Sequence, residues 1–177
     1  MGIFSEDFYN STSNKSASKQ TTQIPMLKDY AIDLETGQLL YNHNEPYLVE
    51  GIDACICLIW KSLHTKRKSL SLDEGYPIYT DDYGSAIHTL KGMTKAYSDS
   101  MIEQMLRDAL IDGTYILSVI NVQTTLSKKG TYTVSFSVRT IYGAIQGSVF
   151  VEDTNEKIML WTDNDTAEDF NYAMERY

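Results

Sequence analysis

The sequence predicts an α+β fold in which a small antiparallel β-meander packs against two main helices, with an N-terminal hairpin and extended terminal arms. Two observations lead to this prediction. In two segments before position 112, apolar residues recur at spacings of three and four, which is typical of amphipathic helices. After position 114 the apolar period changes to two, which is typical of half-buried strands. The length of 177 residues suits one domain with its own core.

The N-terminal part divides into an arm and a hairpin. Residues 1–24 are polar and low in periodicity, which predicts a flexible arm. Residues 26–34 and 38–42 flank a short polar segment in which Gly37 supplies the positive φ that a tight hairpin loop requires. We therefore expect a β-hairpin at the start of the main domain, which is assigned to residues 25–151.

Two helices are expected between the hairpin and the meander. The first runs from Glu50 to about Lys66, and its apolar face is formed by Ile52, Ile56, Ile59, Trp60 and Leu63. The second runs to Ile111, with Ser98 or Asp99 as its N-cap.

The segment between the two helices should be compact. Residues 76–84 form an aromatic cluster between Pro77 and Gly84, which predicts a short buried strand ending in a tight corner. Residues 85–91 then form a short helical stretch that Gly92 closes.

The meander is expected to have three strands, at 114–126, 132–139 and 144–151. The outer strands of such a sheet expose unpaired backbone unless something covers them, and the strand at 144–151 is the expected open edge. The candidate partner-contact residues are Ala144, Gln146, Ser148, Phe150, Tyr115 and Trp161.

Charge limits the classes of partner. The formal net charge is −9 and the sequence pI is about 4.7, so the chain repels polyphosphate and nucleic acid is not an expected partner. A basic run near Lys66 is expected to offset the negative end of the first helix, with phosphate binding as the less favoured alternative. Residues 152–177 form an acidic C-terminal extension with eight acids against two bases, and its aromatic residues favour docking on a partner.

The sequence predicts neither a membrane partner nor secretion. No apolar run approaches the roughly 20 residues of a membrane helix. The N-terminus has no basic region followed by an apolar stretch, so we expect the chain to stay in the cytoplasm where it is made.

Residue types that carry chemistry are sparse, and no cofactor is predicted. Cys55 and Cys57 are too close on one helix to pair easily, and are expected to be buried and reduced, with a metal site as the minor alternative. The adjacent pair Asp81-Asp82 favours capping of turn amides over acid–base work. The acidic stretch 163–169 lacks the glycine that a calcium loop requires at its sixth position.

Four short motifs stand in a fixed order along the chain: Asp33-Leu34-Glu35-Thr36-Gly37, Leu48-Val49-Glu50-Gly51, Trp60-Lys61-Ser62-Leu63 with Thr65, and Tyr76-Pro77-Ile78-Tyr79 with Asp82-Tyr83-Gly84. With this order and spacing, residues 26–151 resemble the lysozyme-like baseplate wedge protein, or sheath initiator, of contractile phage tails and phage-tail-like bacteriocins in its Gram-positive form. A charged Glu-Pro-Arg signature of that family is not evident at the start of the meander.

The resemblance implies a structural protein and not an enzyme. It implies a small domain in the six-fold ring of the baseplate of a virion or tail-like particle, made and assembled in the host bacterial cytoplasm. Its partners would be the tail sheath protein and the baseplate wedge proteins, with hub or tube proteins as further candidates. The domain would join the wedge to the sheath and nucleate sheath assembly by accepting strands at its sheet edge.

Two alternatives come from other classes. A lysozyme-like peptidoglycan hydrolase needs two carboxylates across a cleft, for which Glu50 and Glu103 are the candidates. A soluble regulatory binding module would behave as a free monomer instead of purifying with tail particles.

Overall fold

A computed structural model describes residues 24–67, 83–128, 130–151 and 156–162. The helical elements are α1 (Ile52–His64), the 3-10 helix η1 (Ile87–Leu90) and α2 (Lys95–Leu110). The strands are β1 (Lys28–Tyr30), β2 (Tyr41–Asn42), β3 (Glu45–Pro46), β4 (Leu48–Glu50), β5 (Ile116–Leu126), β6 (Tyr132–Thr140), β7 (Gly143–Val151) and β8 (Glu156–Thr162).

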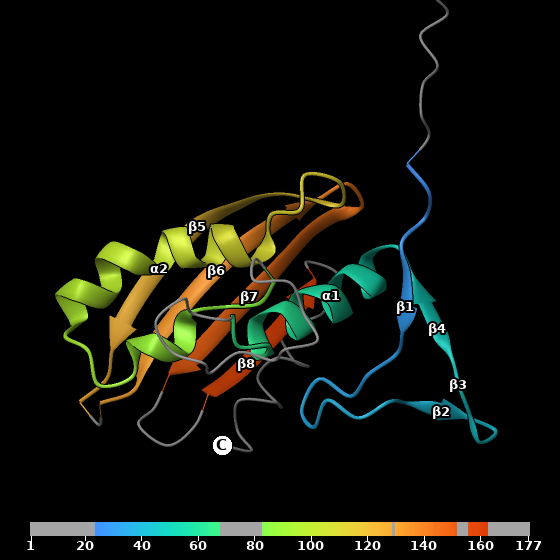
Figure 1. Ribbon diagram of the computed structural model, residues 1–177, viewed down its shortest axis with the longest axis horizontal. Coiled ribbons are helices and arrows are strands. Elements are labelled where there is room, and N and C mark those ends of the chain that lie inside the picture. Colours follow the sequence, from blue (N-terminus) through green and yellow to red (C-terminus); the bar gives the residue numbers. More distant parts are fainter. Residues whose placement is uncertain (1–23, 68–82, 129, 152–155, 163–177) are drawn as a thin grey trace, which may run out of the picture.

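An antiparallel sheet of four strands, in the order β5-β6-β7-β8, forms one layer of the domain. Both α1 and α2 lie over the same face of this sheet, while β1–β4 stand to one side of it (Figure 1). Small antiparallel sheets and two helices confirm the predicted α+β class.

The core fills the space between the helices and the sheet. The helices contribute fully buried residues such as Ile59 of α1 and Leu106 of α2, and the sheet contributes β-branched residues such as Val134 and Val138. Each buried aliphatic side chain of this size contributes about 1.5–3 kcal/mol to folding. The helices are therefore fixed to the sheet by burial along one whole face.

Strand β6 has the alternation that the sequence predicts. Its residues at even positions from Tyr132 to Thr140 are buried, whereas Ser135 and Arg139 on the opposite face are exposed. Ser137 is also buried although it belongs to that opposite face. The sheet thus has one face towards the helices and a second, mainly polar face.

Helix α1 confirms the first predicted helix, but α2 begins earlier than expected. The N-cap of α2 is Thr94, whose hydroxyl accepts a hydrogen bond from the backbone N–H of Tyr97. The expected caps were wrong: Ser98 is buried within the helix, and the carboxylate of Asp99 binds side chains of the sheet instead of helix amides. A threonine hydroxyl satisfies the same orphan amides one turn earlier.

The N-terminal hairpin is only partly as predicted. Gly37 has the expected positive φ of 72°, but Ile32 and Leu39 on either side of the turn form a single bridge. The main partner of β1 is the distant strand β4, in the register Lys28↔Glu50. Non-local pairing of this kind leaves no short-range signal in the sequence.

A second hairpin was not predicted. Strands β2 and β3 are joined by His43 and Asn44, which both have positive φ, at 51° and 69°. Two successive residues of this conformation make the tight turn that matches the twist of a hairpin. Asn44 was the available signal, since asparagine tolerates the left-handed region.

The predicted open edge was wrong. Strand β8 pairs with β7 along its length, from Ile145↔Thr162 to Val151↔Glu156, so the strand at 144–151 is internal. The sheet therefore continues past position 151, where the acidic extension was expected to begin. Ile158 of β8 is buried in the core, which explains why this segment adds to the sheet.

The link between the helices is described only in part. Helix η1 and Gly92, with φ of 72°, confirm the short helical stretch and its closing glycine. Gly84 lies where a tight corner was predicted and has φ of 99°. Residues 76–82, the N-terminal arm up to residue 23 and the segments 152–155 and 163–177 lie outside the described residues, as do the acidic motifs within them.

Candidate interaction surfaces

Four of the predicted contact residues lie on the polar face of β7. Gln146 accepts a hydrogen bond from the Ser137 hydroxyl at 2.5 Å, and the hydroxyls of Ser148 and Ser135 lie 3.1 Å apart. Ala144 and Phe150 occupy the same face, opposite Arg139 and Thr133 of β6. These side chains share one face, but the backbone of β7 is paired on both sides.

The other two predicted residues are not on β7. Trp161 lies on β8 directly opposite Gln146, so the structure brings it onto the same face as the β7 residues. Tyr115 precedes β5, and its hydroxyl donates a hydrogen bond to the carbonyl of Pro25 at 3.2 Å while its ring stacks on Tyr142. Tyr115 therefore holds the N-terminal segment against the sheet.

The edges of the four-stranded sheet are β5 and β8. Strand β5 is the longer, and exposes Leu117, Ile120 and Leu126 by 48%, 38% and 50%. Within the part of the chain that the structure describes, β6 is the only strand paired with β5. Sequence reasoning missed these residues, although apolar side chains at outward positions of an edge strand are themselves a signal of a covered surface.

Two irregularities interrupt β5. The register with β6 shifts between Ile116 and Ser118 and again between Ile120 and Gln123, where Asn121 has a φ of 55°. A bulge of this kind bends an edge strand and limits regular pairing to the stretches between the bulges. Any strand added to this edge meets short regular segments and not a continuous ladder.

The second edge is less accessible. Strand β8 is shorter than β5, and none of its residues from Lys157 to Thr162 is exposed. Both edge strands contact a helix, α1 at β8 and α2 at β5, so it is the exposure of the strand residues that distinguishes them. The two edges therefore differ, and β5 is the more open of them.

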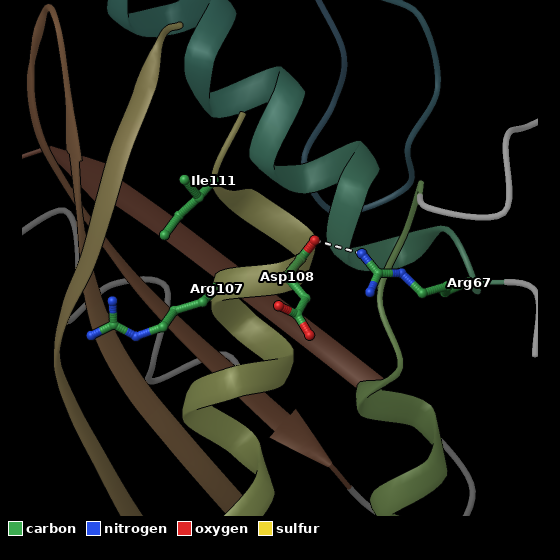
Figure 2. A pocket seen from close by; sticks show the side chains of 4 residues that line it. All are labelled: Arg67, Arg107, Asp108 and Ile111. Carbon is green, nitrogen blue, oxygen red and sulfur yellow. Dashed lines mark hydrogen bonds between the residues drawn. The ribbon is translucent and has the colours of Figure 1, made fainter. Parts of the chain in front are cut away.

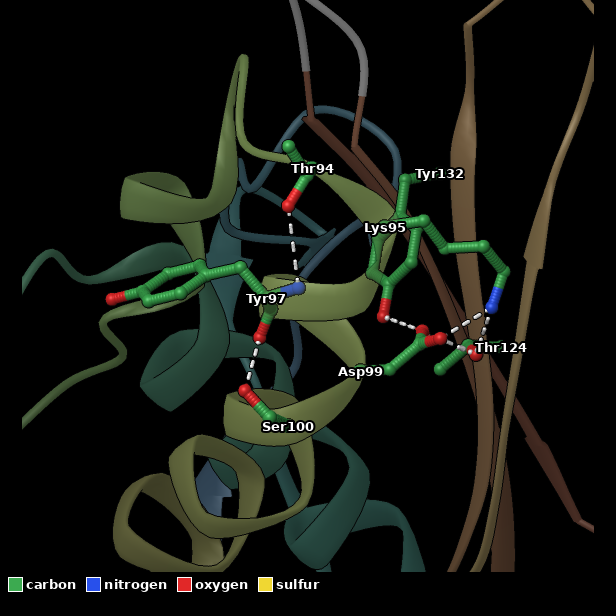
Figure 3. A network of polar contacts seen from close by, with 7 residues as sticks. All are labelled: Thr94, Lys95, Tyr97, Asp99, Ser100, Thr124 and Tyr132. Atoms are coloured by element: carbon green, nitrogen blue, oxygen red, sulfur yellow. Dashed lines mark hydrogen bonds and ion pairs between the residues drawn. The ribbon is translucent and has the colours of Figure 1, made fainter.

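A polar network fixes α2 to the sheet beside this edge (Figure 3). The carboxylate of Asp99 accepts hydrogen bonds from Thr124 of β5 at 2.7 Å and from Tyr132 of β6 at 2.9 Å, and it pairs with Lys95 at 2.5 Å. Hydrogen bonding by Lys95, Thr124 and Tyr132 lowers the pKa of Asp99 to about 2. Burial and the neighbouring Asp99 raise the pKa of Tyr132. The network orients α2 on β5.

A shallow hollow at the end of α2 is lined by Arg67, Arg107, Asp108 and Ile111. The Arg67 guanidinium donates to the carbonyl of Asp108 at 2.5 Å, and the Arg107 side chain points away from Arg67 (Figure 2). Arg107 pairs instead with Glu103 at 2.7 Å. A guanidinium on a terminal helix carbonyl caps the helix. Arg67 of the basic run thus caps α2, and not the first helix as was expected. Lys61 of α1 pairs with Asp29 of β1, so both residues have structural contacts.

Neither of the two carboxylates named as candidates for hydrolysis, Glu50 and Glu103, lines the hollow at the end of α2. Glu50 pairs with Lys28 and Glu103 pairs with Arg107, and both glutamates are more than half exposed. An exposed, ion-paired carboxylate lacks the apolar surroundings that a general acid requires.

The structure also bears on the two cysteines, on metal binding and on membrane insertion. Cys55 and Cys57 are buried and free, as predicted, and burial raises the pKa of Cys55 to about 11. Among the described residues there is no group of three or more histidine, cysteine, aspartate or glutamate side chains that could hold a metal ion. None of the described helices has the length and apolar character needed to cross a membrane.

The comparisons with known proteins decide the family. The profile of the family described as contractile injection system sheath initiator matches residues 28–143. The chain belongs to the sheath initiator family. No curated protein matches the chain. The resemblance found in the sequence is thereby confirmed, and the chain has a structural role in a contractile injection system.

The family match covers β1 to β6 and ends at the first residue of β7. The β5 edge therefore lies within the matched region. Strand β8, which closes the edge at β7, lies beyond it.

Proposed function

We propose that this chain joins the baseplate wedge to the tail sheath and nucleates sheath assembly by accepting strands from sheath subunits at the β5 edge of its sheet. The observation that carries the proposal is the combination of an eleven-residue edge strand with three exposed large apolar side chains in a family of sheath initiators. An added strand would bind the outward backbone groups of β5 and cover these side chains.

The strength of such a contact can be bounded. Each main-chain hydrogen bond contributes about 0.5–1.5 kcal/mol net, so the short regular stretches of β5 give a weak contact when taken singly. Repeated around a ring of identical subunits, the same contact becomes firm because each bound strand raises the effective concentration of the next. A template that is weak alone and strong in a ring suits an initiator.

The particle would be the baseplate of a phage or of a phage-tail-like bacteriocin, assembled in the cytoplasm of the host cell. Within it, the chain performs no bond-breaking chemistry. A zymogram on peptidoglycan is expected to show no clearing by the purified protein, and clearing would instead support the hydrolase.

The decisive test is a charge on the β5 edge. A lysine on an edge strand discourages strand addition because pairing would desolvate the ammonium group. We expect particles carrying Ile120→Lys to form baseplates without sheath. Met93→Lys is the matched control, because Met93 is 53% exposed and lies outside every strand. Sheath of normal length in the Ile120→Lys particles, with the variant folded and incorporated, would refute strand acceptance at this edge.

A further inference from the structure

The N-terminal ribbon, defined here as residues 26–50, stands beside the main sheet (Figure 1) and contacts helix α1 through β1 and β4. The indole N–H of Trp60 donates to the carbonyl of Leu34 at 2.7 Å, and the ammonium group of Lys61 pairs with Asp29. The hydroxyl of Tyr142 accepts a hydrogen bond from the N–H of Leu27 at 2.8 Å. Helix α1 and the turn between β6 and β7 thus anchor the ribbon, so its outer surface is pre-organised.

That outer surface is unusually apolar. Seven large apolar residues of the ribbon are exposed by 39–61%: Met26, Tyr30, Leu39, Leu40, Tyr41, Tyr47 and Leu48. Tyr30 and Leu48 are register partners on β1 and β4, so their side chains lie side by side on one face. Successive residues of an extended segment point to opposite faces, so the exposed apolar side chains are divided between the two faces of the ribbon. A standard interface takes about 800 Å² from each partner, and these side chains would supply part of one.

The charge around this surface indicates the chemistry of its occupant. The ribbon carries five carboxylates and one lysine. Glu50 pairs with this lysine, Lys28, and Asp29 pairs with Lys61 of α1, so the ribbon together with Lys61 has a net charge of −3. Two copies of so acidic a surface repel each other, which disfavours self-association. Tyrosines are frequent anchors at the centre of protein interfaces, where a ring fills an apolar pocket. The complementary surface is apolar with a basic rim.

We propose that the ribbon is a second docking surface, built from different strands than the β5 edge, and that it binds another baseplate protein through apolar pockets surrounded by lysine and arginine. The proposal rests on the proposed function only in placing the chain in a baseplate. It does not require the β5 edge to accept strands, because β1–β4 form sheets of their own.

The first experiment identifies the occupant directly. The photo-reactive residue p-benzoylphenylalanine is placed at Tyr41, the most exposed of these seven apolar residues, and assembled particles are irradiated. We expect a covalent adduct with a polypeptide that is neither the sheath nor this chain, attached next to lysine or arginine residues. The same substitution at Met93 is expected to give no such adduct. An adduct with sheath or with a second copy, or no adduct, would overturn the proposal.

The second experiment measures incorporation. Tyr41→Ser combined with Leu48→Ser is expected to reduce the amount of the chain in purified baseplates at least tenfold. Glu45→Lys is also expected to reduce this amount, because the new lysine would repel the basic rim of the partner. Tyr97→Ser is the matched control, because Tyr97 is 47% exposed on α2 and lies outside the ribbon. Unchanged melting temperatures establish that the variants fold.

The two proposals fail in distinguishable ways. Loss of sheath with the chain still in the baseplate, as expected for Ile120→Lys, tests strand acceptance alone. Loss of the chain itself from the baseplate tests the ribbon. Normal incorporation of the Tyr41→Ser and Leu48→Ser double variant would contradict the ribbon proposal whatever Ile120→Lys does.

Discussion

Adding a single methyl group at Gly147 tests whether β7 lies between two strands. An ideal Cβ on Gly147 would lie 2.5 Å from Cζ of Phe136 on β6 and 3.1 Å from Cδ2 of Leu160 on β8. Carbon atoms in contact are normally about 3.5–4.0 Å apart, so the Phe136 ring must move by about 1 Å. Phe136 is only 2% exposed and is surrounded by core residues.

The expected cost follows from these distances. Overpacking of a filled core lowers the free energy of unfolding by about 1–3 kcal/mol. Replacing a glycine lowers the entropy of the unfolded chain, which offsets about 0.4–1 kcal/mol of this loss. Gly147→Ala should therefore lower the free energy of unfolding by about 1–2 kcal/mol net. In a chain of this size that corresponds to a decrease in Tm of about 3–6 °C.

The assay is thermal and urea unfolding followed by circular dichroism, with a second-site variant. Phe136→Leu removes the obstructing ring, so the double variant should be less destabilised than the sum of the two single changes. Gly92→Ala serves as a control, because nothing lies within 4 Å of its added Cβ and its φ of 72° imposes only backbone strain. An unchanged Tm for Gly147→Ala, or strict additivity with Phe136→Leu, would refute the packing described for β6, β7 and β8.

Three further predictions concern the anchoring contacts and the thiols. The pKa of Asp99 falls from 3.8 to about 2 on folding, so its contribution to the free energy of unfolding is complete above about pH 4 and is lost towards pH 2. The free energies of unfolding of wild type and Asp99→Asn should therefore converge as the pH falls across that range, and a constant difference would contradict this. Trp60→Phe removes the indole donor to Leu34 and should cost about 1 kcal/mol, with faster amide exchange in residues 33–38 as the local readout. Cys55 should be inert to a thiol reagent in the native protein at neutral pH and reactive in concentrated urea, and native reactivity would refute its burial.

Local sequence patterns predicted the helices and strands whose formation depends on residues close together in the chain. The apolar spacing of α1 and the alternation along β6 follow from helix and strand geometry alone, and both were found where expected. The N-cap of α2 was missed because the sequence offers several capping residues close together, and Asp99 is drawn to Tyr132, which is distant in sequence. Tertiary contact thus decided between locally equivalent choices.

The candidate site was harder to predict than the fold. Strand β8 was missed because its apolar core is short and lies within strongly acidic sequence, so composition obscured it. Without β8, β7 became the expected edge and its outward residues became the expected contacts. The β5 edge emerges only when the order of all four strands is known, since edge position is a property of the whole sheet.

The two tyrosine hydroxyls that hold the start of the ribbon have a mechanical consequence. Tyr115 and Tyr142 bind the backbone at Pro25 and Leu27, and both flank strands of the main sheet. A pulling force on the ribbon would reach the sheet through these phenols, close to the turn where β6 meets β7, and would reach helix α1 through Trp60 and Lys61. During contraction of the particle, these contacts would transmit force directly between a protein bound at the ribbon and the main sheet.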